Sequence, residues 1–256
     1  MNPDRPATRA CPVCASRQSN PWLRKPRADL VLHACSECGM VFANPIPASI
    51  SDAYYNDLGR PYYLSADKLA GDHDPVRFRR ELGLLHRHCP GGSILDVGCS
   101  TGGFLSQLSA RWPGRYHGCG LEVSQPAAEH ARNLGLEVLT RSFLDHDFGD
   151  RRFDAITFWA VLEHLPEPGL FLRRAATWLA PGGCVLVLVP NIRALAVRLL
   201  GARYRYILPQ HLNYFSQRTL AHLLSRSGLA VRARGGSHLT PAVIWQAARP
   251  GRHGVV

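Results

Sequence analysis

The chain has 256 residues, of which 46% are hydrophobic and 19% are charged, and its formal net charge at pH 7 is +11. This composition can bury a core, which excludes a largely disordered chain. The sequence contains no run of about 18 apolar residues, so we expect no membrane-spanning helix. The first residues carry no apolar stretch behind their charges, so we expect no secretory signal and a cytoplasmic protein.

The positive charge comes almost entirely from arginine, because Lys25 and Lys68 are the only lysines. The arginines are scattered along the chain rather than gathered in one basic tract. Net charge of this kind bears on solubility and steering more than on function. Nucleic acid therefore remains a possible partner of this chain, but a small molecule is favoured over it.

Four of the eight cysteines form two pairs near the N-terminus, Cys11 with Cys14 and Cys35 with Cys38. Each C-x2-C pair can wrap two thiolates around one metal ion, and the twenty residues between the pairs allow a hairpin to bring them together. Two disulfides are disfavoured in a cytoplasmic chain, and one redox pair would leave the other pair unexplained. The spacing predicts a structural zinc site with four protein ligands and no open position for catalysis.

Residues 41–47 contain two prolines and predict an extended connector. The next segment is rich in tyrosine, with the pairs Tyr54-Tyr55 and Tyr62-Tyr63. Tyrosine combines an apolar ring with a polar tip, so ordinary surface packing and a lid over a substrate both remain open. We expect a zinc-ribbon module over residues 1–45 and an aromatic-rich connector or lid over residues 46–75.

From residue 76 the pattern changes to helices alternating with strands, which predicts an α/β fold with a mostly parallel sheet flanked by helices. We expect this Rossmann-like domain over residues 76–248. Ligands of such sheets bind beyond the carboxyl ends of the strands, where the strand order reverses. The expected helices cover residues 76–89, 104–112, 127–134 and 170–179, and the expected strands cover residues 93–97, 117–123, 137–140, 153–159 and 184–189.

A glycine-rich turn, residues 98–103, follows the first of these strands and leads into a helix. Glycine lets the backbone approach a ligand closely, and Glu122 at the end of the second strand would suit the two hydroxyls of a ribose. The turn lacks the G-x-G-x-x-G spacing of a dinucleotide site, and Asp96 directly before it would repel a pyrophosphate. An acid there suits a cofactor with an ammonium and a sulfonium, which favours S-adenosylmethionine.

Residues 94–105, Ile-Leu-Asp-Val-Gly-Cys-Ser-Thr-Gly-Gly-Phe-Leu, resemble the first motif of class I S-adenosylmethionine-dependent methyltransferases. The pair Glu163-His164 with the later His211-Leu-x-Tyr-Phe is similar to the ubiquinone-biosynthesis-like branch. The cysteine module resembles that of zinc-ribbon methyltransferases, including deoxysugar C-methyltransferases. The resemblance covers about residues 76–235, and its other matching segments are residues 153–156, 159–168, 179–183 and 190–191.

The resemblance implies cofactor contacts from the turn, from the ends of the second and fourth strands and from just after the third strand. These positions are Asp96, Gly98, Cys99, Ser100, Gly102, Glu122, Val123, Ser142, Phe143 and Trp159. Asp96 and the turn would surround the methionine part of the cofactor, and Trp159 would lie near its sulfonium. The family pattern has glycine where this chain has Ser100, and the fold should tolerate serine there if its backbone keeps a negative φ.

Methyl transfer to a hydroxyl or an acidic carbon needs a general base, and the pKa of histidine suits that role. His164, just past the fourth strand, and His211, after the fifth, are the candidates. Glu163 would orient His164 or help it to hold a divalent ion, as in some relatives; alternatively the pair only caps a helix. Residues 192–200 predict a helix with its apolar side toward the core, or else one that lies on a membrane surface.

The resemblance implies methyl transfer to an O or C acceptor on a small molecule: a sugar nucleotide, a glycan or a secondary metabolite. One alternative is an rRNA or tRNA methyltransferase with an N-terminal zinc module, which the net charge favours and the scattered arginines disfavour. A second is a non-catalytic zinc-ribbon binding protein, which the intact Asp96 and Glu122 disfavour. The sequence does not decide the acceptor, the general base or the oligomeric state.

Overall fold

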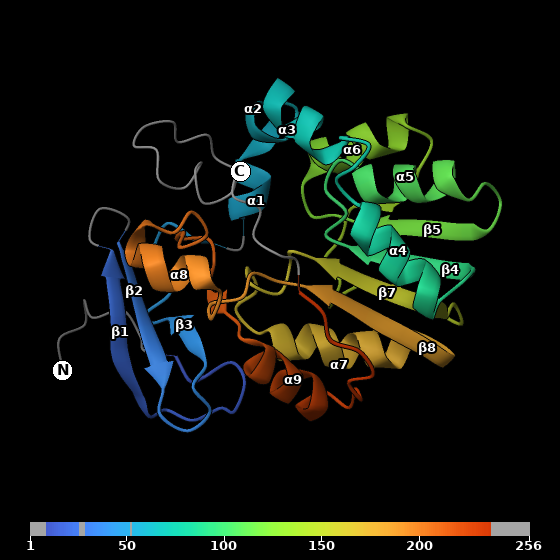
Figure 1. The fold of residues 1–256 in the computed structure, drawn as a ribbon. Coiled ribbons are helices and arrows are strands. Elements are labelled where there is room, and N and C mark those ends of the chain that lie inside the picture. The colour runs from blue at the N-terminus through green and yellow to red at the C-terminus, as the bar shows by residue number, and fades with distance from the viewer. Residues whose placement is uncertain (1–8, 26–28, 52, 237–256) are drawn as a thin grey trace. The chain divides into compact units, whose positions relative to one another are not determined.

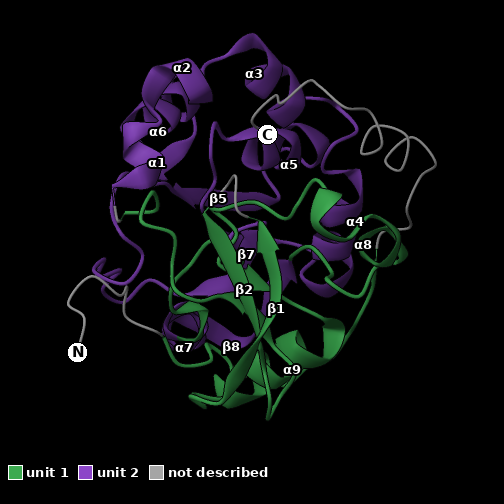
Figure 2. Ribbon diagram, turned by 90° about the vertical axis from the view of Figure 1, so that its left-hand side faces the viewer, with its two compact units in different colours: residues 1–51, 162–169, 189–256 green, residues 52–161, 170–188 purple. Residues whose placement is uncertain are grey.

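The computed structural model describes residues 9–25, 29–51 and 53–236, which form two compact units (Figure 2). Unit 1 combines residues 1–51, 162–169 and 189–256, and unit 2 combines residues 52–161 and 170–188. Each unit contains its own sheet. The division does not follow the linear order of the chain, because unit 1 is assembled from three separate segments.

The sheet of unit 2 has five strands in the order β6-β5-β4-β7-β8, all parallel (Figure 1). The expected Rossmann-like arrangement is therefore confirmed. The order reverses at β4, because the chain passes from β4 to β5 on one side and later places β7 on the other. The strands are β4 (Gly92–Val97), β5 (Tyr116–Leu121), β6 (Glu137–Leu139), β7 (Phe153–Trp159) and β8 (Leu179–Leu188).

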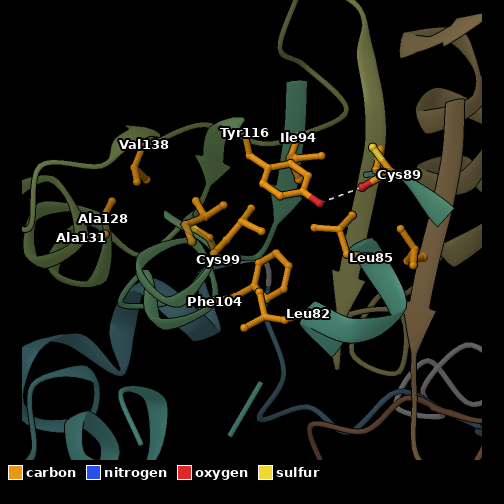
Figure 3. Close-up of a cluster of buried hydrophobic side chains, with 14 residues drawn as sticks. Leu82, Leu85, Cys89, Ile94, Cys99, Phe104, Tyr116, Ala128, Ala131 and Val138 are labelled. Atoms are coloured by element: carbon orange, nitrogen blue, oxygen red, sulfur yellow. Dashed lines mark hydrogen bonds between the residues drawn. The ribbon is translucent and has the colours of Figure 1, made fainter. Parts of the chain in front are cut away.

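Helices cover both faces of this sheet (Figure 1): α4 (Arg79–His88), α5 (Gly103–Arg111) and α6 (Gln125–Asn133) on one face, and α7 (Pro168–Trp178) on the other. The first face carries the main apolar core, where Leu82, Leu85 and Phe104 gather beneath Ile94 (Figure 3). Tyr116 belongs to this core and satisfies its buried phenol by donating to the carbonyl of Cys89 at 2.9 Å (Figure 3). The tyrosine-rich segment before α4 is helical, with α1 (Tyr54–Asp57), α2 (Gly59–Tyr63) and α3 (Ala66–Asp72).

The sheet of unit 1 is antiparallel, in the order β1-β2-β3-β9. Its strands are β1 (Ser19–Lys25), β2 (Leu30–Cys35), β3 (Val41–Ala43) and β9 (Asn213–Tyr214). Pro21 cannot donate to a ladder, which is tolerated because β1 lies at the edge of the sheet. The region expected as an extended connector, residues 41–47, thus begins as the third strand of this sheet.

Strand β9 changes the expected domain division. Residues 189–236 were expected to belong to the domain that begins at residue 76, but they lie in unit 1 with the cysteine module. The physical reason is the pairing of β9 with β3, in which Phe42 faces Asn213 and Val41 faces Tyr214. Such pairing between distant segments has no signature in the local sequence pattern, so sequence reasoning missed it.

Two α-helices and a short 3-10 helix complete the described part of unit 1: α8 (Leu195–Leu200), the 3-10 helix η2 (Gly201–Arg203) and α9 (Gln217–Arg226). In α8, Ala196 and Val197 are buried in the core of the unit, as expected for a core-facing helix, while Leu195 and Leu199 are exposed. The N-terminus of α9 is fixed by a capping box, in which Ser216 and Thr219 each bond the backbone N–H of the other.

Candidate functional site

Asp96 lies at the point where the strand order of unit 2 reverses. It sits near the carboxyl end of β4, it is only 2% exposed, and in the sheet it faces Thr157 of β7. The hydroxyl of Thr157 donates to Oδ1 of Asp96 at 2.6 Å. Burial raises the pKa of Asp96 to about 7, because a charge in this environment loses its hydration. This carboxyl group is thus poised to ionise when a cationic ligand approaches.

The turn after β4 runs close to its neighbours. Gly98 has a φ of +74°, and its N–H donates to the carbonyl of Leu121 in β5 at 2.7 Å. A Cβ atom at Gly98 would lie 2.7 Å from Cγ2 of Val161, closer than atoms normally approach. Both the positive φ and the tight contact with Val161 require glycine here.

Ser100 departs from the expectation of a negative φ, because the structure gives it a φ of +51°, in the left-handed region. Two hydrogen bonds hold it there: its N–H donates to Oε2 of Glu122 at 2.9 Å, and its hydroxyl donates to Oδ2 of Asp72 at 3.0 Å. The turn therefore keeps the backbone shape that glycine would allow, and the serine side chain helps to hold it.

Glu122 follows β5 and is 5% exposed. Its Oε2 accepts the N–H of Ser100 and its Oε1 accepts the N–H of Ser124 at 2.8 Å. Burial raises its pKa, and the hydrogen bonds from the backbone oppose that rise. Val123, the next residue, is 47% exposed. The carboxylate expected at a ribose thus also holds the turn in place.

Asp72, at the end of α3, is a site residue that sequence reasoning missed. Its carboxylate accepts hydrogen bonds from the hydroxyl of Ser100 and from the hydroxyl of Thr101 at 2.8 Å. Nζ of Lys68 donates to both of its oxygens, each at 2.7 Å. Burial alone would raise the pKa of Asp72, but the charge of Lys68 and these hydrogen bonds hold it below its ordinary value. A Cβ at Gly103 would clash with the Asp72 carbonyl. The i,i+4 spacing of Lys68 and Asp72 indicates a helical ion pair, but nothing in it points to the turn.

The structure assigns the other expected cofactor positions to different surroundings. Cys99 is buried, and Gly102 has a φ of +85° and precedes α5. The ring of Phe143 packs in the core between Phe158 and Phe171, with centroid distances of 6.0 and 5.8 Å, while Ser142 is only partly buried in the adjoining turn. Trp159 contacts Phe104, and its indole Nε1 is buried without a hydrogen-bond partner among the described residues.

The three catalytic candidates come together in unit 1. The ligand-capable atoms of Glu163, His164 and His211 all lie within 4.8 Å of one another. The two imidazole rings meet edge to face with a centroid distance of 4.6 Å, and the ring of Tyr206 stacks on His211 at 6.1 Å. Nδ1 of His164 lies 3.0 Å from the carbonyl of Gln210, which can only accept, so Nδ1 carries the proton of the neutral ring.

Burial dominates the electrostatics of this cluster. It lowers the pKa of His164 to about 4 and that of His211 to about 3, so both rings are neutral at physiological pH. It raises the pKa of Glu163 to about 8. Oε2 of Glu163 is buried and has no hydrogen-bond partner among the described residues. Two neutral imidazoles beside such a carboxyl group can accept a proton or hold a cation.

The four cysteines of the N-terminal pairs converge as the sequence predicted. Sγ of Cys11 lies 3.5 Å from Sγ of Cys38, Sγ of Cys14 lies 3.5 Å from Sγ of Cys35, and all four sulfurs lie within 4.8 Å of one another. A tetrahedral zinc ion with Zn–S bonds of about 2.3 Å places its sulfurs about 3.8 Å apart. The donor set and its dimensions therefore fit zinc, and none of these cysteines is joined in a disulfide in the described structure.

Comparison with known proteins agrees with this geometry. A family model described as "Methyltransferase domain" matches residues 73–234. The chain is 31% identical over 163 residues to a ubiquinone biosynthesis O-methyltransferase of Aeromonas salmonicida, covering 59% of this chain and 68% of that protein. It is 36% identical over 138 residues to a protein of the same name from Caulobacter sp., covering 50% of this chain and 53% of that protein.

The fold is similar to a solved structure from Thermotoga maritima described as an S-adenosylmethionine-dependent methyltransferase and possible histamine N-methyltransferase. The TM-score is 0.52 at 22% identity, over 63% of this chain and 74% of that one. This likeness concerns the fold. Within the described residues, no helix is both long enough and apolar enough to cross a membrane.

Proposed function

Because the chain belongs to the methyltransferase-domain family and is an S-adenosylmethionine-dependent methyltransferase, we propose that it methylates an oxygen or carbon atom of a small-molecule acceptor. The observation that carries the choice of a small molecule is the 31% identity, over 163 residues, to a ubiquinone biosynthesis O-methyltransferase. The cysteine module resembles that of zinc-ribbon methyltransferases, and this resemblance extends the proposed acceptor classes to sugar nucleotides, glycans and secondary metabolites.

The residues of unit 2 fit the cofactor. Asp96 and Glu122 put two buried carboxyl groups at the carboxyl ends of adjacent strands, which suits a ligand with an ammonium, a sulfonium and a ribose diol. Asp96 would face the methionine ammonium, Glu122 would accept from the ribose hydroxyls, and Val123 would lie against adenine. The orphan indole N–H of Trp159 offers a further donor. Ser142 and Phe143 would flank the adenine, with Ser142 as the less buried of the two.

S-adenosylmethionine supplies an electrophilic methyl group, so the protein has to position the acceptor and remove its proton. His164 is proposed as the general base and His211 as the residue that closes the other side of the acceptor. Both rings are neutral at physiological pH, which is the protonation state that a general base requires before it accepts a proton. Glu163 and His164 follow Trp159, the last residue of β7, by four and five residues in the chain.

The same cluster supports a second role, in which Glu163, His164 and His211 hold a divalent ion that would bind and acidify an acceptor hydroxyl. The observation in its favour is the buried, unpartnered Oε2 of Glu163 beside two neutral imidazoles. Metal analysis separates the two roles. If the cluster binds an ion, the wild type should hold one ion more per chain than the cysteine site accounts for, and Glu163→Gln should lose it. One ion per chain in both the wild type and Glu163→Gln would favour the role of His164 as general base.

We also propose that Cys11, Cys14, Cys35 and Cys38 hold a structural zinc ion, on the basis of their converging thiolates. With four protein ligands this ion would have no position for an acceptor, so its contribution would be to folding.

The proposal is tested by incubating the purified full chain with S-adenosylmethionine and panels of phenols and catechols, sugar nucleotides and structured RNA. Release of S-adenosylhomocysteine with a small molecule is expected, and turnover only with RNA would replace the small-molecule proposal. We expect His164→Asn to lower the rate at least 100-fold, as for loss of a general base. The exposed His117 provides the control His117→Asn, which should be active.

Asp96→Ala tests the cofactor site separately. It is expected to abolish binding of S-adenosylhomocysteine in calorimetry and to leave the zinc content unchanged. Unchanged affinity in this variant would refute the assignment of the cofactor to the turn after β4.

A further inference from the structure

Two segments of unit 1 carry the whole histidine cluster: residues 162–166, with Glu163 and His164, and residues 210–213, with His211. They are joined directly by backbone hydrogen bonds, because the carbonyl of Glu163 accepts from the N–H groups of Leu212 at 2.7 Å and Asn213 at 3.0 Å. The bond between His164 and the carbonyl of Gln210 adds a third link. The spacing of the two histidines therefore depends on how these two segments are held.

Asn213 is the centre of that support. It is 1% exposed, and its side-chain amide donates to the carbonyl of Leu162 at 2.9 Å and to the carbonyl of Leu165 at 2.6 Å. These two carbonyls flank Glu163 and His164 in the chain. One amide group thus binds the loop on both sides of the candidate base, from a residue that lies two positions after His211.

Arg9 completes the support from the cysteine module. Its Nη2 donates to Oδ1 of Asn213 at 2.8 Å and to the carbonyl of Leu212 at 3.0 Å, and its Nη1 donates to the carbonyl of Pro166 at 3.1 Å. Its guanidinium also lies over the ring of Phe42 in β3, 5.3 Å from the centroid. The planar fork of arginine can reach three acceptors at once, which a lysine ammonium cannot do in the same geometry.

Arg9 lies two residues before Cys11, and Phe42 of β3 faces Asn213 of β9. The N-terminal module therefore reaches the histidine cluster by two routes, through a side chain and through a strand pairing. Arg9 is partly buried, and its Nη1 and Nη2 are engaged by the two segments, while its Nε is buried without a hydrogen-bond partner among the described residues. Holding a cation in such surroundings is costly, and its three hydrogen bonds to the two segments offset that cost.

We propose that Arg9 and Asn213 are positioning residues for Glu163, His164 and His211, so that the cysteine module is a structural part of the acceptor site. The catalytic importance of that site rests on the function proposed above, but the positioning itself does not. The interaction between Arg9 and Asn213 orients the two loops and thereby fixes the protonated nitrogen of His164 toward Gln210.

The test is the imidazole spectrum of the full chain, labelled with 15N in histidine and assigned with His164→Asn and His211→Asn. Wild-type His164 at pH 7 should show the neutral ring protonated at Nδ1, as its hydrogen bond to the carbonyl of Gln210 requires. In Arg9→Lys the signals of His164 should show a mixture of the two neutral tautomers. Arg17, an exposed arginine of the same module, supplies the control Arg17→Lys, which should match the wild type.

Asn213→Asp is the second variant, because it keeps an acceptor for Arg9 and removes both donors to the loop. It should change the His164 tautomer as Arg9→Lys does, while affinity for S-adenosylhomocysteine stays within twofold of wild type. Unchanged ring signals in both folded variants would overturn the proposal, as would ring changes accompanied by loss of cofactor binding, which would indicate general unfolding. No acceptor is needed, so failure here is distinguishable from failure of the proposed base, which His164→Asn turnover reports.

Discussion

Ser100→Gly tests how the turn after β4 is held, because the family pattern has glycine at this position and a simple expectation is that glycine stabilises. Ser100 has a φ of +51°, and a residue with a side chain in the left-handed region costs about 1–2 kcal/mol. Glycine relieves that cost but loses about 0.5–1 kcal/mol through the entropy of the unfolded chain. Considered alone, these two effects favour glycine slightly.

The contact between Ser100 and Asp72 reverses this balance. The serine hydroxyl donates to a buried carboxylate at 3.0 Å, and a hydrogen bond to a charged group contributes about 1.5–3 kcal/mol. We therefore expect Ser100→Gly to lower the free energy of unfolding by about 1.5 kcal/mol in the wild-type background. In an Asp72→Ala background that hydrogen bond is already absent, so the same change should raise stability by about 0.5–1 kcal/mol.

The assay is urea unfolding followed by tryptophan fluorescence for the four proteins of this cycle, accepted only where the m values agree. We expect the effect of Ser100→Gly on the free energy of unfolding to change sign between the wild-type and Asp72→Ala backgrounds. This corresponds to a coupling energy of about 2 kcal/mol between Ser100 and Asp72. If Asp72→Ala does not fold, Asp72→Asn replaces it. Equal effects of Ser100→Gly in both backgrounds, within about 0.5 kcal/mol, would refute the claim that Asp72 holds the turn.

Three further predictions concern the other charged and thiol groups. Because burial raises the pKa of Asp96 to about 7, the affinity for S-adenosylhomocysteine, whose ammonium requires the carboxylate, should fall toward tenfold per pH unit below pH 7. Calorimetry of the wild type from pH 6 to 8.5 measures this slope, and an affinity that stays constant below pH 7 would contradict the assignment. Burial raises the folded-state pKa of Glu163 to about 8, so the folded chain holds a proton that the unfolded chain releases at lower pH. The free energy of unfolding should therefore fall as pH rises toward 8, by at most about 1.4 kcal/mol per pH unit. In chelator-treated protein, urea unfolding between pH 6.5 and 8.5 should show this fall in the wild type and not in Glu163→Gln. Cys11→Ser should remove bound zinc in metal analysis, whereas Cys184→Ser should retain it, and equal zinc in both would exclude the four-cysteine site.

The sequence predicted the parts of this protein whose determinants lie close together in the chain. Each strand and helix of unit 2 has a local apolar pattern, and the alternation of the two leads to a parallel sheet. The C-x2-C pairs are likewise local, and their four sulfurs converge as expected. Asp96 is predicted as a cofactor ligand because it directly precedes a glycine-rich turn, and chain neighbours remain neighbours in any fold.

Only the tertiary structure decided the rest, because its determinants are contacts between distant residues. Asn213 bonds Arg9 from 204 positions away, and Ser100 bonds Asp72 from 28 positions away. A left-handed φ at Ser100 is unfavourable for an isolated serine, and the partners that stabilise it cannot be inferred from its neighbours in the sequence. The sequence by itself thus determined the α/β fold and the convergence of the four cysteines, whereas only the folded chain decided which distant segments hold the side chains in place, since long-range hydrogen bonds and strand pairings form only once the chain is packed.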